Sequence, residues 1–445
     1  MDAPENKSPD TRMPELGNPS FGEALRVWLK IGCIGFGGPS GQIAILQQEV
    51  VEKRNWVSEA EFLRALKFCM LLPGPEAQQL ATYLGWRLHG IRGGIAAGVL
   101  FLLPAALLLW VLSLLYVIGQ DAPLLHAFFE GLKPAVVAIV ATALWRIGRR
   151  TITSTPLALI ACVALLLFCL HASYPAVLMG FGILGSLFLP KSGEDLHTKE
   201  TSMSGEASWA RTLCVVLTLG SLWIMPIAAL LCWLGSKALP VQVALFFGKV
   251  AVFSFGGAYA ALSYVALHAA GDWGWVTSGE MLDGLGLAET TPGPLLIALQ
   301  FVAFVACYKS PGILPPLLAA TIGSVTALWS LFLPSFLWIF ALAPHMERLG
   351  QNRHMAGALS AIGAVVTAVI AYLALWFAGS VFIVTAVISA TSLTSAGGAS
   401  IPISIHWTPL ILSLAAYLLL ETKRLGIVSL ILLFGGIGIL IRIVT

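Results

Sequence analysis

Apolar runs that carry few or no charged residues follow one another along most of this chain. They lie at 94–119, 134–145, 156–170, 174–190, 212–235, 312–343, 356–378 and 408–441. A helix that spans a membrane needs about 20 such residues, so the pattern predicts a chain that crosses a membrane several times. Several runs are shorter than that, which indicates half-helices or tilted pairs of helices.

The composition agrees with this pattern. Hydrophobic residues make up 58% of the 445 residues and charged residues 11%, and the mean hydropathy is +0.88. Soluble proteins have about 25% charged residues, so the composition excludes an ordinary soluble protein. Residues 1–20 are polar and contain no apolar stretch like that of a signal peptide, so we expect a cytoplasmic tail there. The seven cysteines lack C-x-x-C spacing and are predicted to be buried apolar side chains rather than metal or redox sites.

Two helix-breaking motifs each occur twice, at the same separation. The motif F-G-G occurs at Phe36, Gly37 and Gly38 and again at Phe255, Gly256 and Gly257. The motif P-G-P occurs at Pro73, Gly74 and Pro75 and again at Pro292, Gly293 and Pro294. The differences in residue number, 255 − 36 and 292 − 73, are equal, and Trp56 and Trp275 share this offset. Interrupted helices present free backbone groups to a solute, so paired breaks predict a transporter built from internal repeats.

A polar segment divides the chain into two halves. We expect a first transporter repeat at 21–190, a cytoplasmic linker at 191–211, a connecting transmembrane helix at 212–238 and a second repeat at 239–445. The single extra crossing is predicted to place the second repeat upside down in the membrane relative to the first.

The distribution of basic residues favours this inversion. Twelve Lys and Arg lie between 21 and 150 but only four between 240 and 378, and Lys53-Arg54 corresponds to Asp272-Trp273. Because Lys and Arg collect in cytoplasmic loops, matched loops are predicted to face opposite sides of the membrane. The expected fold is an all-α polytopic membrane protein with two inverted-topology repeats and broken or re-entrant helices. A parallel duplication with an accidental charge bias is the alternative.

The segment 61–89 is predicted to be a re-entrant hairpin. Basic residues flank it at both ends, and P-G-P interrupts it near its centre. Proline removes a backbone donor and clashes with the preceding turn, so one continuous spanning helix is disfavoured. Two half-helices keep both basic ends on the cytoplasmic side, and irregular backbone at membrane depth is tolerated where it lines a cavity.

The backbone of both motifs is the first candidate for a binding site. Paired glycines let amides approach a ligand, and a helix that starts just beyond them offers its positive end to an anion. Proline in the first turn of a helix favours the same arrangement after P-G-P. Glycine also serves close helix packing in membranes, but its repetition after a phenylalanine favours binding.

Polar side chains near the breaks are the second candidates. Gln78 and Gln79 in one half, and Thr290 and Thr291 in the other, have the hydrogen-bonding groups to replace the hydration of an oxyanion; helix capping is the alternative for the threonines. Lys30 and Lys249 each lie six residues before F-G-G. They are predicted to be countercharges for a dianion, with snorkelling to an interface as the alternative. Glu76 and Glu289 are candidate proton-linked acids or partners of those lysines.

Other chemistries find little support. Gly38-Pro39-Ser40-Gly41 has the G-x-S-G pattern of intramembrane serine proteases, but the second half lacks it and no histidine is placed as a base. The chain has no H-E-x-x-H motif and no Walker loop. We therefore expect no enzyme activity, cofactor, metal site or nucleic-acid partner.

The motifs together resemble the chromate ion transporter (CHR) family, long-chain two-domain type. The resemblance rests on FGGPSGQIAILQQEVVEKRNWV, FCMLLPGPEAQQLATYLGW, FSFGGAYAALSYV and LAETTPGPL, and it covers nearly the whole chain. It implies that the family's motifs fall on Phe36 to Pro39, Trp56, Pro73 to Gln79, Phe255 to Gly257 and Thr291 to Pro294. The second half has Leu295 to Ala298 in place of the E-A-Q-Q continuation, so an asymmetric site is expected.

The resemblance implies a secondary transporter that exports chromate from the cytoplasm across the inner membrane and gives chromate resistance. Sulfate is the expected competitor, and a transporter or channel for another oxyanion such as sulfate is the alternative. We expect a multi-pass protein of the cell inner membrane, surrounded by lipid. A homodimer is common among transporters, but no residue predicts one. The coupling ion and the role of 381–405 stay open.

Overall fold

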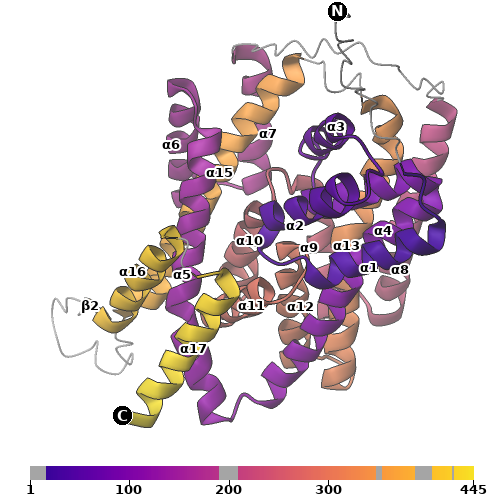
Figure 1. Cartoon of the computed structure of the whole chain (residues 1–445). Helices are drawn as coiled ribbons and strands as arrows, with labels where there is room; N and C mark the ends of the chain where they lie inside the picture. The colour runs from indigo at the N-terminus through magenta and orange to yellow at the C-terminus, as the bar shows by residue number, and fades with distance from the viewer. Residues whose placement is uncertain (1–16, 190–208, 347–352, 386–402, 423–424, 445) are drawn as a thin grey trace, which may run out of the picture.

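The computed structural model describes residues 17–189, 209–346, 353–385, 403–422 and 425–444. Nearly all of them are helical, and the described strands are the short antiparallel pair β1 (Ile383–Thr385) and β2 (Ile403–Ile405). Six of the described helices are long and apolar enough to cross a membrane (Figure 1). The predicted all-α polytopic membrane protein is confirmed. Most of the predicted tail, linker and 381–405 segment lies outside the described residues.

The first half and the connecting helix supply nine helical elements within the described residues. They are α1 (Phe21–Ile34), α2 (Gly38–Gln47), the π-helix η1 (Gln48–Glu52), α3 (Glu59–Cys69), α4 (Glu76–Ile118), α5 (Pro123–Thr151), α6 (Thr155–Cys169), α7 (Tyr174–Phe188) and α8 (Trp209–Leu234).

The second half repeats the same order. Its elements are α9 (Leu239–Phe253), α10 (Ala258–Ala266), the π-helix η2 (Leu267–Asp272), α11 (Ser278–Thr290), η3 (Leu295–Ile297), α12 (Ala298–Lys309), α13 (Pro316–Leu342), η4 (Ala343–His345), α15 (Arg353–Phe382), α16 (Trp407–Glu421) and α17 (Ile427–Val444). From α1 to α3 each boundary recurs at the offset of the sequence motifs to within two residues. Even the π-helix η1 has its counterpart in η2, so the repeat of the sequence is a repeat of structure.

Helix α4 folds back on itself. His89 and Gly90 leave the helical conformation, with Gly90 at a φ of +62°. The segments 76–88 and 91–118 then pack closely, because Gly85 lies against Gly93 and Gly98 lies against Thr82, with no room for a Cβ atom. The predicted apolar run 94–119 is therefore the second leg of a helical hairpin. Helices α12 and α13 pack in the same way in the second half.

Ion pairs tie together the two ends of each hairpin that carries a P-G-P motif. Arg87 Nε lies 2.6 Å from a Glu61 oxygen, which joins the start of α3 to the end of the first leg of α4. Lys309 Nζ lies 2.6 Å from a Glu280 oxygen and joins α12 to α11. Glu61 and Glu280 occupy matched positions of the two halves. The pair of half-helices predicted for 61–89 is therefore present, with its ends side by side and P-G-P at its tip.

The two halves exchange their terminal hairpins. Helix α5 packs against α16 and α17 of the second half, and α15 packs against α6 and α7 of the first. Figure 1 shows the α6–α7 hairpin beside α15 at one end of the molecule and α17 beside α5 at the other. Glycines make both contacts close: Gly131 meets Gly438, and Gly185 meets Gly357. Each half thus covers a long helix of the other half: α16 and α17 cover α5, and α6 and α7 cover α15.

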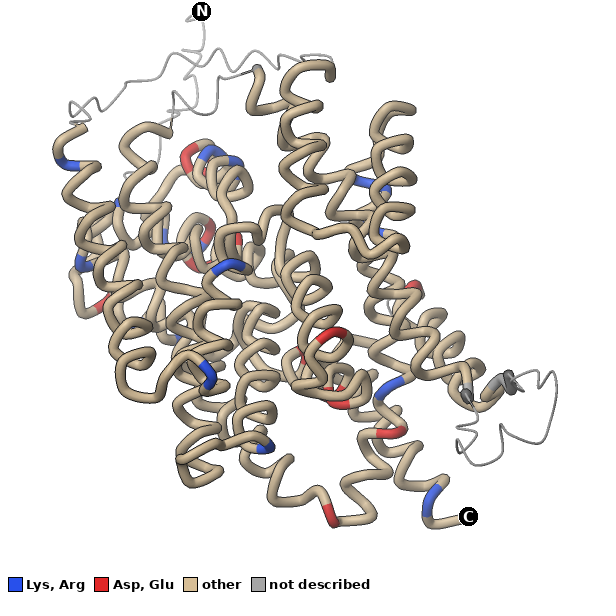
Figure 2. Tube along the Cα trace, turned by 180° about the vertical axis from the view of Figure 1, so that it is seen from behind, with Lys and Arg blue, Asp and Glu red and all other residues tan. Residues whose placement is uncertain are grey.

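Charged residues are few along the described helices (Figure 2). Large apolar side chains such as Leu107, Leu166 and Ile183 are exposed on the outer faces of helices, as expected where lipid replaces water. The prediction that all cysteines are buried was wrong. Cys69 and Cys307 are buried, but Cys33, Cys162, Cys169, Cys214 and Cys232 are exposed. An apolar sequence context does not distinguish a lipid-facing side chain from a buried one.

The close contact at Gly185 gives a test of the exchange of hairpins. A Cβ atom at Gly185 would lie 2.6 Å from the Gly357 carbonyl oxygen, whereas Gly180 on the same helix has open space. We expect Gly185→Val to destabilise the protein by about 1–3 kcal/mol, because overpacking forces α7 away from α15. Gly180→Val is the matched control and keeps the wild-type midpoint. The measurement is the thermal unfolding midpoint in detergent, and equal midpoints for the two variants would contradict the packing.

Candidate functional site

The F-G-G motifs form equivalent turns between helices. The Phe36 amide donates to the Ile34 carbonyl at 2.8 Å, and the Phe255 amide donates to the Phe253 carbonyl at 2.9 Å. Both glycines of each motif have positive φ angles, from +68° to +97°. Other residues rarely adopt such angles, which explains why glycine recurs here. As predicted, helices start here: α2 begins at Gly38, the last residue of its motif, and α10 begins at Ala258, directly after the second motif.

The P-G-P motifs join the two halves through their single backbone donors. Proline has no backbone N–H, so Gly74 and Gly293 carry the only amide hydrogens of their motifs. The Gly74 amide donates to the Ser254 carbonyl at 2.8 Å, and the Gly293 amide donates to the Gly35 carbonyl at 2.9 Å. Ser254 and Gly35 are themselves matched positions of the two halves, and each directly precedes F-G-G. Each tip is therefore bonded to the opposite half's break, and the two bonds are equivalent.

A small cavity lies where these breaks meet. Its lining comes from the starts of α2, α4, α10 and η3, and consists of Pro39, Gln42, Pro75, Glu76, Ala77, Gly257, Ala258, Pro294 and Leu295. The first turn of a helix leaves backbone N–H groups without helical partners, and its dipole attracts anions. Four such turns surround this cavity. Its volume of ≈ 10 Å³ is about that of one water molecule, so the structure is closed around the site.

Gln42 is a polar lining residue that the sequence analysis missed. Its side chain is 1% exposed, and its Nε2 donates to the carbonyls of Gly293 and Gly35. Its Oε1 has no partner within the described residues. The matched residue in the second half is Ala261, so this contact exists on one side only. The available signal was a carboxamide side chain inside the apolar stretch after F-G-G. The helical period alone did not predict that this side chain faces the break.

The predicted glutamines support the first break rather than line the cavity. Gln79 Nε2 donates to the Pro73 carbonyl at 2.7 Å, and Gln78 Nε2 donates to Thr82 Oγ1 at 3.2 Å. Both side chains are fully buried, and their Oε1 atoms have no partner within the described residues. Gln79 thereby fixes the shape of the turn that presents the Gly74 amide.

The predicted threonines bond to their own helix. Thr290 Oγ1 donates to the Leu287 carbonyl at 2.7 Å, and Thr291 Oγ1 donates to the Ala288 carbonyl at 2.9 Å. Both hydroxyl groups thus donate to carbonyls in the last turn of α11. This is the kind of structural role that helix capping, the alternative to binding, would give them. Binding of an oxyanion by these hydroxyls stays a prediction and requires those bonds to change.

Lys30 belongs to an ion cluster outside the cavity lining. Its Nζ lies 3.0 Å from a Glu49 oxygen, and Lys53 and Arg54 bind the same carboxylate at 2.7 and 2.6 Å. Burial on its own raises the pKa of Glu49, but hydrogen bonds from Lys53, Lys30 and Arg54 outweigh it and lower the pKa to about 2. Lys249 is exposed and has no ion pair within the described residues. The role of both lysines as countercharges stays a prediction.

Both candidate acids, Glu76 and Glu289, lie close to the breaks. Glu76 lines the cavity, whereas Glu289 is 6% exposed and accepts a hydrogen bond from the Tyr259 hydroxyl at 2.8 Å. Asp283, which the sequence analysis did not name, is also buried and accepts a hydrogen bond from the Tyr116 hydroxyl at 2.9 Å. Its tyrosine partner lies 167 residues away, and spacing along the chain does not reveal that contact.

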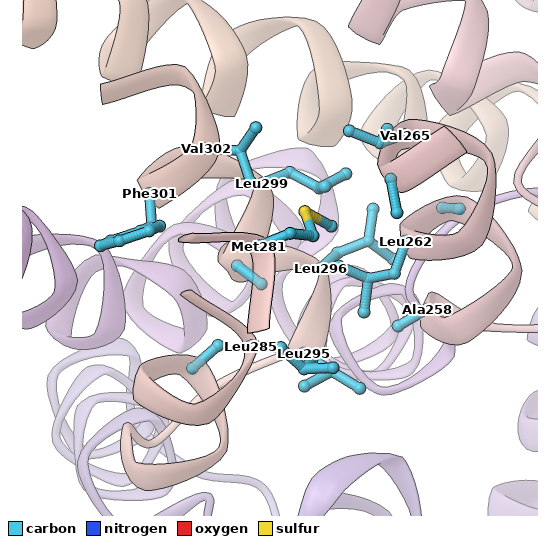
Figure 3. Close-up of a cluster of buried hydrophobic side chains, with 14 of the residues drawn as sticks. Ala258, Leu262, Val265, Met281, Leu285, Leu295, Leu296, Leu299, Phe301 and Val302 are labelled. Carbon is cyan, nitrogen blue, oxygen red and sulfur yellow. The ribbon is translucent and has the colours of Figure 1, made fainter. Parts of the chain in front are cut away.

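Apolar packing holds the second break in place. Figure 3 shows side chains of α10, α11, η3 and α12 meeting in one cluster, with Leu262 and Leu296 at its centre and Leu295 near Ala258. Leu295 stands where the first half has Glu76. The predicted asymmetry of the site thus corresponds to an apolar wall on one side and the polar groups Glu76 and Gln42 on the other.

The described residues around the cavity show no arrangement typical of a metal centre or a serine hydrolase. Within the described ranges no group of three or more His, Cys, Asp or Glu residues is placed to hold a metal ion. Ser40, the candidate nucleophile of the G-x-S-G pattern, is exposed on α2 and has no hydrogen bond to a histidine in the described part of the chain. The polar groups of the lining are the first turns of the helices, the Gln42 carboxamide and the Glu76 carboxyl group.

Broken helices that meet at the contact between two repeats, in a chain with several membrane-spanning helices, are typical of membrane transporters. The chain belongs to the chromate transporter family, whose model matches residues 22–186 and 241–439. The match makes the protein a transporter rather than an enzyme, as predicted.

Related sequences agree with this assignment. A chromate transport protein of Pseudomonas aeruginosa is 31% identical over 353 residues, which cover 79% of each chain. A probable chromate transport protein of Synechococcus elongatus is 29% identical over 356 residues, 79% of this chain and 83% of the relative. A chromate transport protein of Cupriavidus metallidurans is 24% identical over 353 residues, 78% of this chain and 81% of the relative. No solved structure matches the chain.

The bonds at the tips predict the effect of added side chains. Gly74 and Gly293 have φ angles of +125° and +107°, and a Cβ atom would lie 2.6 Å from Ser335 Oγ or 2.5 Å from Ala105 Cβ, respectively. We expect Gly74→Ala and Gly293→Ala each to lower transport at least tenfold, because the tip must move and its bond to the other half is lost. Transport per molecule in proteoliposomes is the measurement.

Gly312→Ala is the matched control for these variants. Gly312 also has a positive φ angle of +64° but has open space around it in a loop. We expect near wild-type transport from this variant. Full transport by Gly74→Ala and Gly293→Ala would show that the reciprocal bonds are not needed.

Proposed function

We propose that this protein is a secondary transporter that exports chromate from the cytoplasm across the inner membrane and thereby gives chromate resistance. The observation that carries the proposal is the pair of reciprocal bonds, Gly74 to Ser254 and Gly293 to Gly35, around a cavity lined by four helix starts. The names of the relatives from Pseudomonas aeruginosa and Cupriavidus metallidurans supply the substrate.

The chemistry of the site suits a tetrahedral dianion. Helix N-termini bind oxyanions through backbone amides without a formal positive charge. The Gln42 carboxamide stabilises the second break, because its Nε2 donates to the Gly293 carbonyl. Because amides bind less strongly than buried lysines would, an anion held in this way can also leave, as transport requires.

The reciprocal bonds give a physical form to alternating access. In the inverted arrangement that we propose, the two bonds lie on opposite sides of the cavity. Opening one bond while the other stays closed would connect the cavity to one side of the membrane. Because the bonds are equivalent in length and geometry, the inward-open and outward-open states would be close in free energy.

Charge favours the outward direction. Arg150 lies near enough to Glu76, and Arg146 to Tyr259, for their charges to act on these groups. The corresponding stretch of the second half, Leu375 to Gly379, is uncharged. On the cytoplasmic side that we propose for these arginines, their positive charge would attract dianions. A dianion that leaves a cell with a negative interior also gains about 4.6 kcal/mol per 100 mV, or about three decades of gradient.

Cysteine labelling tests the inverted topology. Glu52 and Gly271 are both exposed and occupy matched positions of the two halves, at the ends of η1 and η2. In a variant without native cysteines, we expect Glu52→Cys to react with an impermeant reagent only from the cytoplasmic side and Gly271→Cys only from the opposite side. Labelling of both positions from one side would establish a parallel duplication instead.

Flux measurements test substrate and direction together. In everted membrane vesicles with an imposed interior-positive potential, we expect the wild-type protein to accumulate chromate and the empty membrane not to. Reversal of the potential should reverse the flux, since the substrate is a dianion. Sulfate transport without chromate transport would instead establish a carrier for another oxyanion. A chromate flux that does not depend on the membrane potential would contradict electrogenic export.

A further inference from the structure

Glu76 holds a carboxylate where the proposed substrate should lie. It is the first residue of α4, directly after P-G-P, and it lines the cavity between the breaks. A Cβ atom on Gly257 would lie 3.9 Å from Glu76 Oε1, so the side chain reaches the start of α10 in the other half. Glu76 has no hydrogen bond or ion pair among the residues that the structure describes.

The surroundings of Glu76 are built for an anion. Helix starts from both halves converge on the cavity, and their amides favour negative charge. Gln42, 1% exposed, lines the same cavity, and its Oε1 has no partner in the described part of the chain. A protonated carboxyl could donate a hydrogen bond to such an acceptor, whereas a carboxylate could not. The matched position in the second half is Leu295, so the cavity contains a single acidic side chain.

A carboxylate and a dianion exclude one another from so small a space. The cavity of ≈ 10 Å³ has room for about one water molecule beside Glu76. Two negative groups that compete for the same amides repel each other strongly where water is excluded. Substrate can therefore enter only if the side chain moves away or loses its charge.

Resting on the function proposed above, we propose that Glu76 is a tethered anion that occupies the oxyanion site when ionised and releases it to substrate on protonation. The proton comes from the aqueous phase to which the site is open at that moment. Proton and substrate then bind cooperatively, and each chromate carries one proton with it. The cycle then moves one net negative charge rather than two, so the membrane potential contributes half of the free energy given above for the bare dianion.

Few other titratable groups act on this position. The thiol of Cys69 on α3 and the guanidinium of Arg150 on α5 interact with Glu76 electrostatically. The hydrogen-bonded pair Tyr259 and Glu289 lies on α10 and α11. The residues that α2 and η3 contribute to the lining, Pro39, Gln42, Pro294 and Leu295, do not titrate. Glu76 is thus the group whose charge decides occupancy of the site.

Chromate binding as a function of pH tests the proposal. With purified protein in lipid nanodiscs, we expect the affinity of the wild type to fall as pH rises, by up to about tenfold per pH unit more than that of Glu76→Gln. Protonation of chromate itself affects both proteins equally and cancels in the comparison. Glu59→Gln is the matched control, because Glu59 is exposed at the start of α3, and it keeps the wild-type pH dependence.

A second measurement needs no variant. In weakly buffered solution at mildly alkaline pH, where chromate is a dianion, wild-type binding should take up protons, as reported by a pH indicator. Proton uptake together with a flatter profile for Glu76→Gln supports the proposal. Chromate binding by the wild type without proton uptake and with the pH profile of Glu76→Gln overturns it and leaves the export function standing. Absence of chromate binding at every pH overturns the export function itself.

Discussion

Two backbone hydrogen bonds, from Gly74 to Ser254 and from Gly293 to Gly35, organise the centre of this protein. A backbone amide at membrane depth that finds no partner costs several kcal/mol, so each broken segment must be satisfied by other protein groups. Here the glycine amide of each P-G-P motif donates to the carbonyl that precedes the F-G-G motif of the other half. The first turns of four helices then line the cavity.

The rest of the fold holds the two tips in contact. The ion pairs Glu61–Arg87 and Glu280–Lys309 close the base of each hairpin. Glycine contacts within α4 bring its two legs together, and the cluster around Leu296 fixes the second tip (Figure 3). Close packing through small residues is the main source of helix association in a membrane, because lipid removes the hydrophobic advantage of larger ones.

Much of this architecture could be predicted from the sequence, since helix breakers act locally. The paired breakers of F-G-G and P-G-P end helices at all four places, so these turns and the half-helices between them were correctly placed. Single prolines such as Pro104 and Pro134 lie inside helices and would not have been reliable signals. Repetition at a fixed offset then identified equivalent elements. Partners across the two halves were not predictable, because no local rule pairs Gly74 with Ser254 or turns Gln42 toward Gly293. The prediction of side-chain burial failed for the same reason, since five cysteines in apolar sequence are exposed.

The ion cluster at Glu49 shows a related limit. A lysine in an apolar helix, such as Lys30, signals a functional charge only if no acid neutralises it, and its acid lies 19 residues further along. His268 and Asp272 of the second half match Glu49 and Lys53 of the first, and His268 Nε2 lies 3.7 Å from the Asp272 carboxylate. The acid and the base have therefore exchanged places. The acidic residue thus occupies the first position of the pair in one half and the second position in the other.

The exchange of terminal hairpins also governs how this chain can be assembled. Until α16 and α17 have been synthesised, α5 has no protein to cover the face that carries Gly131, and that face must rest against lipid. A fragment of half this length would therefore be incomplete as a monomer. If the two halves were encoded by separate genes, the two subunits would have to associate in the membrane through the same exchanged hairpins.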